Sequence, residues 1–584
     1  MLSFNHVREV AATYLFLLGE DRKRLPLLWI SVLVSSALDV MGVGLVLPFL
    51  TIATRPEAIH EIAWLKPIAH LAWSHGQLVI AFGVAFLFIF LVKSYFSARL
   101  HLFTAGFAFR QDTDKRVQLL TRFMLAPYAY HLDKDRASVV NSLVQNINKY
   151  SSSLLALLRM FSELVVVIFL VILIFVTDPV VFYVLALSLT TILFIYMYLT
   201  RGEAVKWGEI AVVSNQAMYK SIQESIEGLK EIRSLGIEDS FINRLASAGK
   251  IVELSSLGLT RVSILPRYVL EGGFVGVIVL LVIIFVSFED NLSQLIPMLA
   301  LLGLAGLRLL PSLNIIVTSF SVVRFSYPAV KQVREDLENN KPSRTKNGLT
   351  TTIGNEQFDT LSLRNVSFSY TKSNREVIAN ISFDVGCQQS IGIIGGSGAG
   401  KTTLIDLILC LLAPTKGEIL VNGQSITRNS KYWWNMVAYI PQTPFLSDDT
   451  IRRNIALGID EGSINEQRID KAIDSAQLQS LINQLPDGKN TVIGDRGIRL
   501  SGGQRQRIAI ARAIYYDRQV FIFDEATSAL DSKTESEIVN AIEVLRHSKT
   551  MIIIAHRMST LAHCDRILEI NNGCIVEVPA FAAS

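Results

Sequence analysis

Long apolar stretches dominate the first 320 residues of the chain, and short apolar runs between polar segments dominate the rest. A bilayer core requires about 20 apolar residues in one helix. Stretches of that length predict six membrane-spanning helices: Leu25–Ala53, Leu78–Ala98, Ser153–Val176, Pro179–Thr200, Val262–Phe288 and Leu295–Phe320. The later part has alternating and short buried-strand patterns. The pattern therefore predicts an α-helical transmembrane domain followed by an α/β domain.

Composition argues against a nucleic-acid partner and against a disulfide or cysteine-based metal site. The chain has 584 residues, of which 50% are hydrophobic and 18% charged, and its net charge is only +4. No block of like charge indicates a nucleic-acid partner. The four cysteines lack C-x-x-C or metal-ligand spacing, which predicts free thiols. The polar and mixed segment Met1–Arg24 lacks the pattern of a cleavable signal peptide, so the first apolar stretch is expected to be retained.

Lysine and arginine predict the orientation of the spans. They are concentrated before the first span and in the long segments after the second and fourth spans, and are scarce in the other connections. Because basic loops stay in the cytoplasm, both termini and the C-terminal domain are expected there. The two long segments predict helical extensions of the spans, with tips near Ala126–Tyr130 and Leu235–Glu238 that contact the C-terminal domain. The domain bounds expected are 1–330 for the membrane domain, 331–359 for a linker and 360–584 for the α/β domain.

One connection on the opposite side has a pattern of its own. Within Pro56–His75, apolar residues recur at helical spacing from Leu65 to Trp73. This predicts a short external helix, for which two positions remain open: the lipid interface, or packing against the spans.

The stretch from Gly395 to Thr403 is a candidate phosphate-binding loop. It fits the pattern G-x-x-x-x-G-K-[ST] and lies between a predicted buried strand and a predicted helix. Its residues are Gly395, Gly396, Ser397, Gly398, Ala399, Gly400, Lys401, Thr402 and Thr403. The glycines allow successive backbone N–H groups to face one anion, and the helix N-terminus adds partial positive charge. Lys401 is expected to reach the β- and γ-phosphates, and the Thr402 hydroxyl to reach Mg²⁺.

Further predicted strands end in groups suited to ATP hydrolysis. The strand at Val520–Phe523 leads into Asp524, which suits contact with Mg²⁺, and Glu525, which suits activation of water. The strand at Met551–Ile554 leads to His556, expected at the same edge of the sheet. Ser501 is expected to cap the helix that follows it.

These motifs together resemble the ATPase domain of the ABC transporter family. The residues that carry the resemblance are the phosphate loop, Gln442, Leu500-Ser501-Gly502-Gly503-Gln504, Asp524-Glu525, Ser528-Ala529-Leu530-Asp531 and His556, in that order. With six spans ahead of them, the whole chain resembles an exporter-type half-transporter.

The resemblance implies ATP and Mg²⁺ as cofactors and a head-to-tail homodimer with two competent sites. Each ATP would lie between the phosphate loop of one chain and Ser501–Gln504 of the other. Tyr370 would stack on the base, Gln442 would contact ATP and Mg²⁺, Asp531 would contribute to the ATP site, and Glu525 and His556 would be catalytic. Asp495, in Gly494–Gly497, stands where exporters usually have glutamate.

Charged residues within the predicted spans are candidates for cargo binding, because a charge at the bilayer centre costs about 2.5–3.5 kcal/mol on insertion scales. Arg267 has Glu271 four residues away, whereas Arg308 has no carboxylate at that spacing on its own helix. The segments around Arg267 and Arg308 resemble bacterial lipid-linked oligosaccharide flippases of the PglK family, with Lys93 in place of one arginine and Ile315 in place of another. That resemblance implies a cavity for a lipid pyrophosphate; the alternative from the residues is internal ion pairing or a depth near the membrane interface.

The chain is thus interpreted as a bacterial inner-membrane translocase that uses ATP to move a lipid-linked oligosaccharide, a polyprenyl-pyrophosphate glycan, from the cytoplasmic to the outer leaflet. An exporter of drugs, peptides or other lipids is the first alternative. A membrane-tethered regulatory ATPase that transports nothing is the second.

Overall fold

The computed structural model of the chain describes residues 4–579, except 45–74, 178, 201, 289–294, 340–356, 371–374, 427–430, 495–496, 499, 526–531, 547, 556–557 and 563. These residues belong to two compact units, Met1–Ala126 with Lys134–Lys341, and Pro127–Asp133 with Pro342–Ser584. The predicted external helix up to residue 74 lies outside the described residues, as do Asp495, Asp531 and His556.

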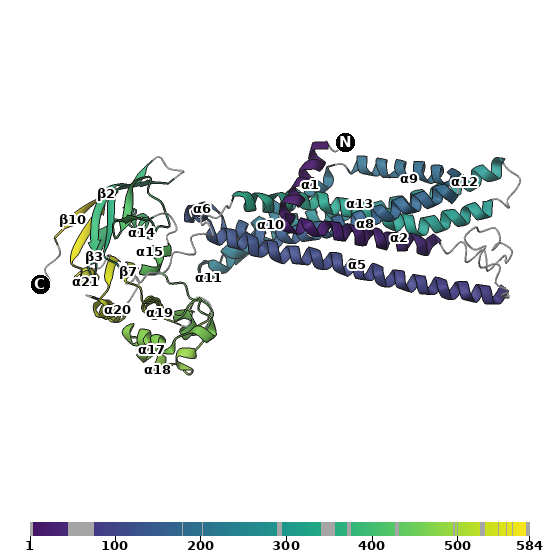
Figure 1. Cartoon of the computed structure of the whole chain (residues 1–584). Helices are drawn as coiled ribbons and strands as arrows, with labels where there is room; N and C mark the ends of the chain where they lie inside the picture. The colour runs from purple at the N-terminus through teal and green to yellow at the C-terminus, as the bar shows by residue number, and fades with distance from the viewer. Residues whose placement is uncertain are drawn as a thin grey trace. The chain divides into compact units, whose positions relative to one another are not determined.

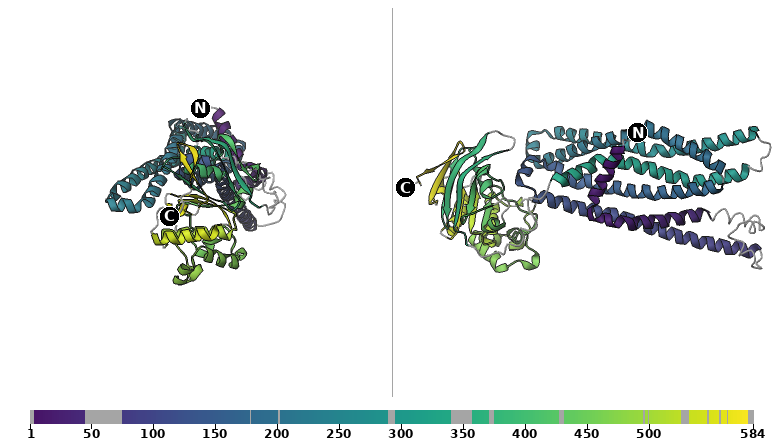
Figure 2. Two further views of the ribbon diagram at one scale, coloured as in Figure 1. Left: turned by 90° about the vertical axis from the view of Figure 1, so that its left-hand side faces the viewer. Right: turned by 45° about the horizontal axis from the view of Figure 1, so that its top comes forward.

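The first unit is entirely helical in its described part, and its long helices run side by side in Figure 1 and in the right-hand view of Figure 2. Its elements are α1 (Phe4–Leu18), η1 (Gly19–Arg24), α2 (Leu25–Gly44), α5 (His75–Leu125), α7 (Arg136–Asn141), η3 (Ser142–Asn146), α8 (Ile147–Thr177), α9 (Pro179–Leu199), α10 (Glu203–Glu227), α11 (Leu229–Leu235), α12 (Glu238–Phe288) and α13 (Leu295–Asn339).

The number of spans is lower in the described residues than the six predicted. Helices in four segments are long and apolar enough to cross a membrane: Val79–Leu125, Arg136–Val176, Glu238–Ile283 and Gly306–Asn339. The bent pair Phe182–Tyr198 and Glu203–Glu227 gives up to five. The predicted first span begins as α2, but its last part lies outside the described residues. A count of six is therefore not confirmed.

The expected helical extensions are present. Helices α5 and α12 each have 51 residues, roughly 75 Å at 1.5 Å per residue. The first expected tip is the turn after α5, from which α6 (Tyr128–Asp133) follows within the second unit. The second is the turn at Gly236, whose φ of 65° ends α11. Contact of either tip with the α/β domain stays a prediction.

The predicted linker begins too early. Residues 331–339 continue α13, which ends at Asn339. Val330, Val333 and Leu337 are buried at helical spacing, so the segment has an apolar face. Arg334 also pairs with Glu338 one turn later, at 2.9 Å. The polar composition of residues 331–339 led to the prediction of a linker, because the buried apolar positions are few and widely spaced.

Close packing joins the helices of the first unit. Val166 and Leu170 of α8, Leu185 of α9, Phe274 of α12 and Leu309 of α13 form one buried cluster. Elsewhere α10 and α13 approach so closely that a Cβ on Gly208 would lie 2.1 Å from the Phe325 carbonyl oxygen. No larger residue fits this crossing without movement of a helix.

The second unit contains two sheets. An antiparallel sheet has the order β2 (Glu376–Gly386), β1 (Thr360–Ser369), β4 (Lys416–Val421), β5 (Gln424–Ser425). The other has the order β10 (Cys574–Val578), β9 (Arg566–Asn571), β3 (Ser390–Gly395), β8 (Thr550–Ile554), β7 (Val520–Asp524), β6 (Val437–Ile440). Its strands pair in parallel except at β10, as expected for an α/β domain.

The remaining helices of the second unit follow β3 along the chain. They are α14 (Lys401–Ile408), α15 (Lys431–Met436), α16 (Ile451–Ile455), α17 (Glu466–Ser475), α18 (Gln479–Gln484), α19 (Gly502–Tyr515), α20 (Ser532–Leu545) and α21 (Met558–Leu561), with short turns η5 (Glu461–Ser463) and η6 (Gly488–Asn490). Figure 1 shows α17 to α20 together, in green to yellow.

The parallel sheet separates two hydrophobic cores. Along β7, Val520 and Ile522 belong to one core, and Phe521 and Phe523 to the other. This alternation is the period of two expected of a strand covered on both faces. Because β7 is anchored on both sides, the residues at its carboxyl end have a well-supported backbone.

The cysteines are free, as predicted. Cys410 and Cys564 are buried, whereas Cys387 and Cys574 are exposed.

Candidate functional site: the ATP site and the membrane cavity

The phosphate loop joins β3 to α14. Gly395, Gly398 and Gly400 have φ angles of 156°, 77° and 106°, a region that glycine adopts readily. A Cβ on Gly395 would lie 2.6 Å from the Ile570 carbonyl oxygen, so this position also requires glycine for space. Gly396, Ser397 and Gly398 are exposed. The loop thus offers backbone N–H groups to an anion at the start of α14.

Lys401 lies across this loop. Its side chain is buried, and Nζ donates to the carbonyl oxygens of Gly395 at 2.8 Å and Gly396 at 3.1 Å. An ammonium held at the mouth of a phosphate loop is positioned for phosphate oxygens. Thr402, in the first turn of α14, is exposed and leaves its hydroxyl available.

Tyr370 and Thr403 meet beside the loop. The Tyr370 hydroxyl and Thr403 Oγ1 are 3.0 Å apart. The Tyr370 ring is half-buried and packs edge-on against Phe368, with centroids 5.0 Å apart. Stacking of this ring on a nucleotide base stays a prediction.

The carboxylates lie at the end of β7, as predicted. The Tyr439 hydroxyl donates a hydrogen bond to Asp524 Oδ2 at 2.9 Å. Glu525 has a φ of 47°, and its N–H donates to the Ile554 carbonyl oxygen at 3.0 Å. Gln442 Nε2 donates to Glu525 Oε2 at 3.2 Å. Residues far apart in sequence, Gln442 and Glu525, therefore meet at one sheet edge.

Burial and like charge raise the pKa of two carboxyl groups at this edge. Burial raises the pKa of Asp524, and the neighbouring Glu525 carboxylate raises it further. Burial, with the charge of Asp524, raises the pKa of Asp406 to about 6. Asp406, on α14, was not identified from the sequence, because nothing local shows that helix α14 places it near Asp524.

The residues present fit Mg²⁺ bound together with ATP. Among the described residues, no group of three or more His, Cys, Asp or Glu side chains is arranged to hold a metal ion. Mg²⁺ is commonly bound by one or two carboxylates together with substrate phosphates and water. Asp524, with the Thr402 hydroxyl and the Gln442 amide oxygen, offers such a partial set.

Ser501 caps α19, as predicted. Its Oγ accepts from Gln504 N at 3.3 Å, while Gln504 Oε1 accepts from Ser501 N at 2.8 Å. This reciprocal capping box leaves the Gly502 and Gly503 amides at the helix N-terminus. Binding of this end to the ATP of a second chain stays a prediction.

Helix α19 is attached to the segment that follows β6. Gln506 Nε2 donates to the carbonyl oxygens of Gln442 at 2.6 Å and Pro441 at 3.0 Å. Arg512 donates to the carbonyl oxygens of Phe445 at 3.1 Å and Asn454 at 2.9 Å. Sequence reasoning missed both residues. The available signal was that Gln506, a polar residue, lies among the apolar positions of an amphipathic helix.

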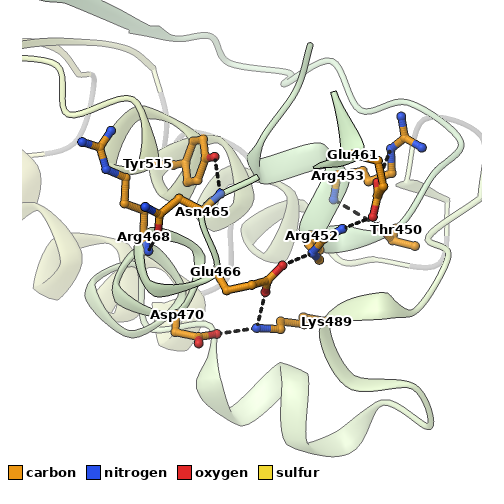
Figure 3. Close-up of polar contacts among 10 residues, drawn as sticks. All are labelled: Thr450, Arg452, Arg453, Glu461, Asn465, Glu466, Arg468, Asp470, Lys489 and Tyr515. Carbon is orange, nitrogen blue, oxygen red and sulfur yellow. Dashed lines mark hydrogen bonds and ion pairs between the residues drawn. The ribbon is translucent and has the colours of Figure 1, made fainter. Parts of the chain in front are cut away.

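A polar network supports the far end of α19 (Figure 3). Arg452 pairs with Glu461 and Glu466, and Lys489 pairs with Glu466 and Asp470. Asn465 caps α17, and its N–H donates to the hydroxyl of Tyr515, the last residue of α19. The network therefore joins α16, α17 and the end of α19.

Two predicted ATP-site residues, Asp531 and His556, lie outside the described residues. The strand ahead of His556 is placed as expected, since β8 pairs in parallel with β7 and Ile554 lies opposite Asp524. The roles assigned to both residues remain predictions.

A cavity of about 560 Å³ lies between α12 and α13 in the first unit. Arg267 lines it and pairs with Glu271 at 2.8 Å, as the spacing predicted, with 63% of its side chain exposed. Leu270, Phe274 and Leu310 supply apolar walls. The Asn314 amide also lines it, and its Oδ1 is buried without a hydrogen-bond partner among the described residues.

The cavity does not gather all the predicted basic residues. Among the described residues, its lining includes neither Lys93 nor Arg308. Lys93 lies on α5, with Nζ 5.1 Å from the centre of the Phe90 ring. Arg308 is half-buried on α13, between the lining residues Leu307 and Leu310. Ile315, which stands where the resemblance implies arginine, does line the cavity.

Known proteins are similar to the ATPase domain of this chain and, over a greater length, to most of the chain. A family profile described as "ABC transporter" matches residues 378–528. The ATP-dependent lipid A-core flippase of Cupriavidus metallidurans is 30% identical over 474 residues, which cover 79% of this chain and 77% of that protein. The heterocyst differentiation ATP-binding protein HepA of Nostoc is 34% identical over 358 residues, 61% of this chain and 57% of that protein.

A solved structure has the same fold over nearly the whole chain. It is that of a bacterial Atm1-family ABC exporter with ATP bound, with a TM-score of 0.74, 21% identity and coverage of 95% of this chain and 94% of that one. The length and identity of the flippase match, together with the site described above, carry the assignment. The chain belongs to the ABC transporter family and is an exporter-type half-transporter whose ATPase domain couples ATP hydrolysis to transport.

Proposed function

We propose that this exporter is a flippase for a phosphate-bearing lipid glycan, and that its cargo is a polyprenyl-pyrophosphate oligosaccharide. It acts in a bacterial inner membrane, with both termini cytoplasmic, and moves the glycan from the cytoplasmic to the outer leaflet. Relatives that carry the name lipid A-core flippase support a lipid cargo. The segments around Arg267 and Arg308 support the finer assignment through their resemblance to oligosaccharide flippases.

The observation that carries the proposal is the chemistry of the cavity between α12 and α13. Arg267 supplies an exposed guanidinium, which suits bidentate contact with phosphate. The Asn314 side-chain amide, which also lines the cavity, suits a hydrogen bond with a sugar hydroxyl. Leu270, Phe274 and Leu310 suit an isoprenoid or acyl chain. A single cavity with these features matches an amphipathic anionic glycolipid.

A phosphorylated lipid A-core glycolipid is the second candidate. The names of the relatives favour it, and its headgroup has the same chemistry of phosphate and sugar. The two cargoes differ in the lipid, which is a single isoprenoid chain in one and several acyl chains in the other.

At the ATP site, this chain's residues bind, orient and move a proton. Lys401 and the loop amides hold the phosphates, Tyr370 stacks on the base, and Thr402, Gln442 and Asp524 hold Mg²⁺. When bound, Mg²⁺ neutralises charge that develops on the transferred phosphoryl group. Glu525 accepts a proton from the attacking water, and His556 is the second proposed catalytic residue.

The proposed pairing of two chains completes each site. Ser501–Gln504 of a second copy faces the phosphate loop of the first, so that ATP joins the two ATPase domains. Closure favours the outward-open arrangement of the spans, and hydrolysis resets them. The cavity residue Arg267 releases its phosphate when the cavity opens outward.

A cargo panel tests the proposal. Proteoliposomes would be given fluorescent polyprenyl-pyrophosphate oligosaccharide, lipid A-core, or a hydrophobic drug, with ATP or a non-hydrolysable analogue. The expected result is ATP-dependent outward movement of the first cargo and stimulation of ATPase activity by it. Movement of lipid A-core alone would select the second candidate, movement of the drug alone would select a general exporter, and movement of none would favour a tethered ATPase.

A further inference from the structure

Gln506 is a buried polar side chain whose position the ATP-site motifs do not explain. It lies on α19, one turn beyond Ser501, and is 3% exposed. Its side-chain amide Nε2 donates to the Gln442 carbonyl oxygen at 2.6 Å and to the Pro441 carbonyl oxygen at 3.0 Å. One amide therefore holds two consecutive peptide groups against the helix.

The peptide groups that Gln506 holds lie at a change in backbone structure. Strand β6 ends at Ile440, so the chain at Pro441 and Gln442 has left the sheet. The Gln442 side chain then extends to Glu525, with Nε2 3.2 Å from Oε2. The distance between Gln442 and Glu525 thus depends on a backbone segment that the sheet no longer supports.

The other atom of the Gln506 amide shows which function the side chain serves. Its Oε1 is buried and has no hydrogen-bond partner among the described residues. A buried amide normally satisfies both its donor and acceptor atoms. Here the side chain acts as a donor, and its orientation is determined by the two carbonyl groups that it holds.

A second attachment of α19 isolates the part played by Gln506. Arg512 holds the Phe445 and Asn454 carbonyl oxygens, further along the same segment. Arg512 therefore anchors the distal part of the segment, and Gln506 anchors the part next to Glu525.

We propose that Gln506 is a positioning residue for ATP hydrolysis: through the Gln442 backbone it sets the position of the Gln442 side chain relative to Glu525. The inference goes beyond the proposed cargo, because it concerns hydrolysis by this chain whatever lipid it moves. Gln506 acts through Gln442, which is proposed to contact ATP and Mg²⁺, and binds neither itself.

The test replaces Gln506 with methionine in the full-length protein. Methionine has a similar length and volume and lacks the donor, so Gln506→Met keeps the packing and releases both carbonyl groups. We expect kcat for ATP to fall about tenfold, since a factor of ten corresponds to one modest loss of transition-state stabilisation, and KM for ATP to change by less than about twofold. Gln506→Glu, which also lacks the amide donors, is expected to lower kcat at least as much.

A second readout needs no nucleotide. Hydrogen–deuterium exchange in the nucleotide-free protein is expected to speed up at the amides of residues 442–446 in Gln506→Met, while β7 and β8 stay protected. The matched control is Gln479→Met, because Gln479 is an exposed glutamine on α18 whose Nε2 donates to Asn483 Oδ1 at 2.9 Å, outside the ATP site. This control is expected to match the wild type in kcat and exchange.

Three results would overturn the inference. They are a wild-type kcat in Gln506→Met, a lower kcat without faster exchange at residues 442–446, and faster exchange throughout the ATPase domain, which would show a role in folding alone. None of these depends on which cargo the protein moves, so failure here is distinguishable from failure of the proposed function.

Discussion

The ATP site and the membrane cavity use charged residues in opposite ways. Lys401 is 7% exposed and held by two carbonyl groups of its own loop. Arg267 is 63% exposed, and it pairs with Glu271 on the same helix. A reaction requires groups held in one geometry. A cavity that must bind and release a bulky lipid is served by a long, exposed side chain in an apolar surround.

The largest expected effect follows from removing the general base. Glu525→Gln keeps the shape of the side chain but cannot accept a proton. General-base catalysis contributes about 10²–10⁴-fold, so ATP turnover should fall by at least about a hundredfold while ATP binding is retained. Steady-state hydrolysis and binding of a fluorescent ATP analogue measure the two. Normal turnover in Glu525→Gln would remove Glu525 from this role.

The control for that experiment is Glu543→Gln. Glu543 is an exposed carboxylate on α20 that pairs with Arg546 at 3.8 Å, and it lies outside the proposed site. The same chemical change there should leave turnover within about twofold of the wild type, because exposed ion pairs contribute little.

The next largest effect is expected from removing the proposed phosphate-binding arginines of the membrane domain. Arg267→Ala, alone or together with Arg308→Ala, should abolish flipping of a pyrophosphate lipid while basal ATPase activity stays unchanged, because the cavity loses the guanidinium of Arg267, the proposed partner of the phosphate. Arg261→Ala is the matched control, since Arg261 is an exposed arginine on the same helix and does not line the described cavity. Unchanged flipping in the double variant would refute a phosphate-binding role for these arginines.

A smaller effect concerns the stability of the helical unit. Asp336, 3% exposed, accepts from Lys134 at 3.0 Å, Ser142 at 2.7 Å and Gln332 at 3.2 Å. Asp336→Asn removes the carboxylate charge that accepts these three hydrogen bonds and should destabilise the unit by about 1–3 kcal/mol. Thermal unfolding of the purified protein at pH 7 measures this, and a melting temperature equal to that of the wild type would show that the contacts contribute nothing.

The smallest effect concerns the network in Figure 3. Hydrogen bonds and charge from Lys489 and Arg452 lower the pKa of Glu466. Because the folded pKa is the lower one, this stabilisation is present above the unfolded pKa of about 4.3 and is lost as the pH falls through the folded value. Glu466→Gln should therefore lower stability slightly at pH 7, by less than about 1 kcal/mol after solvent screening, and leave kcat unchanged. A difference in unfolding that grew as the pH fell towards 3 would contradict this sign.

The ATP site was largely predictable because its chemistry is local in sequence. The loop from Gly395 to Thr403 and the cap at Ser501 each require particular residues at fixed offsets, so a single sequence reveals them. Asp406 and Gln506 were missed because their roles come from contacts with Asp524 and Gln442, which are distant in sequence. Nothing in the residues adjacent to them indicates those contacts.

The membrane domain was less predictable because apolar periodicity marks length and not arrangement. The long helices and their turns at Leu125 and Gly236 were anticipated. The extension of α13 to Asn339 was not, because its buried stripe is interrupted by charges. Composition likewise does not distinguish Arg267, which lines the cavity, from Arg308, which does not.

The most direct test of the central proposal compares two transport rates. One is the rate for a pyrophosphate-linked glycan, and the other is the rate for a neutral lipid that carries the same glycan. Both lipids would be labelled on the glycan, placed in the ATP-accessible leaflet of the same proteoliposomes, and followed by loss of quenching after ATP addition. The proposal predicts ATP-dependent movement of the pyrophosphate lipid and little movement of the neutral one. Equal rates for the two lipids would contradict recognition of the phosphate, and with it the assignment of the cavity at Arg267.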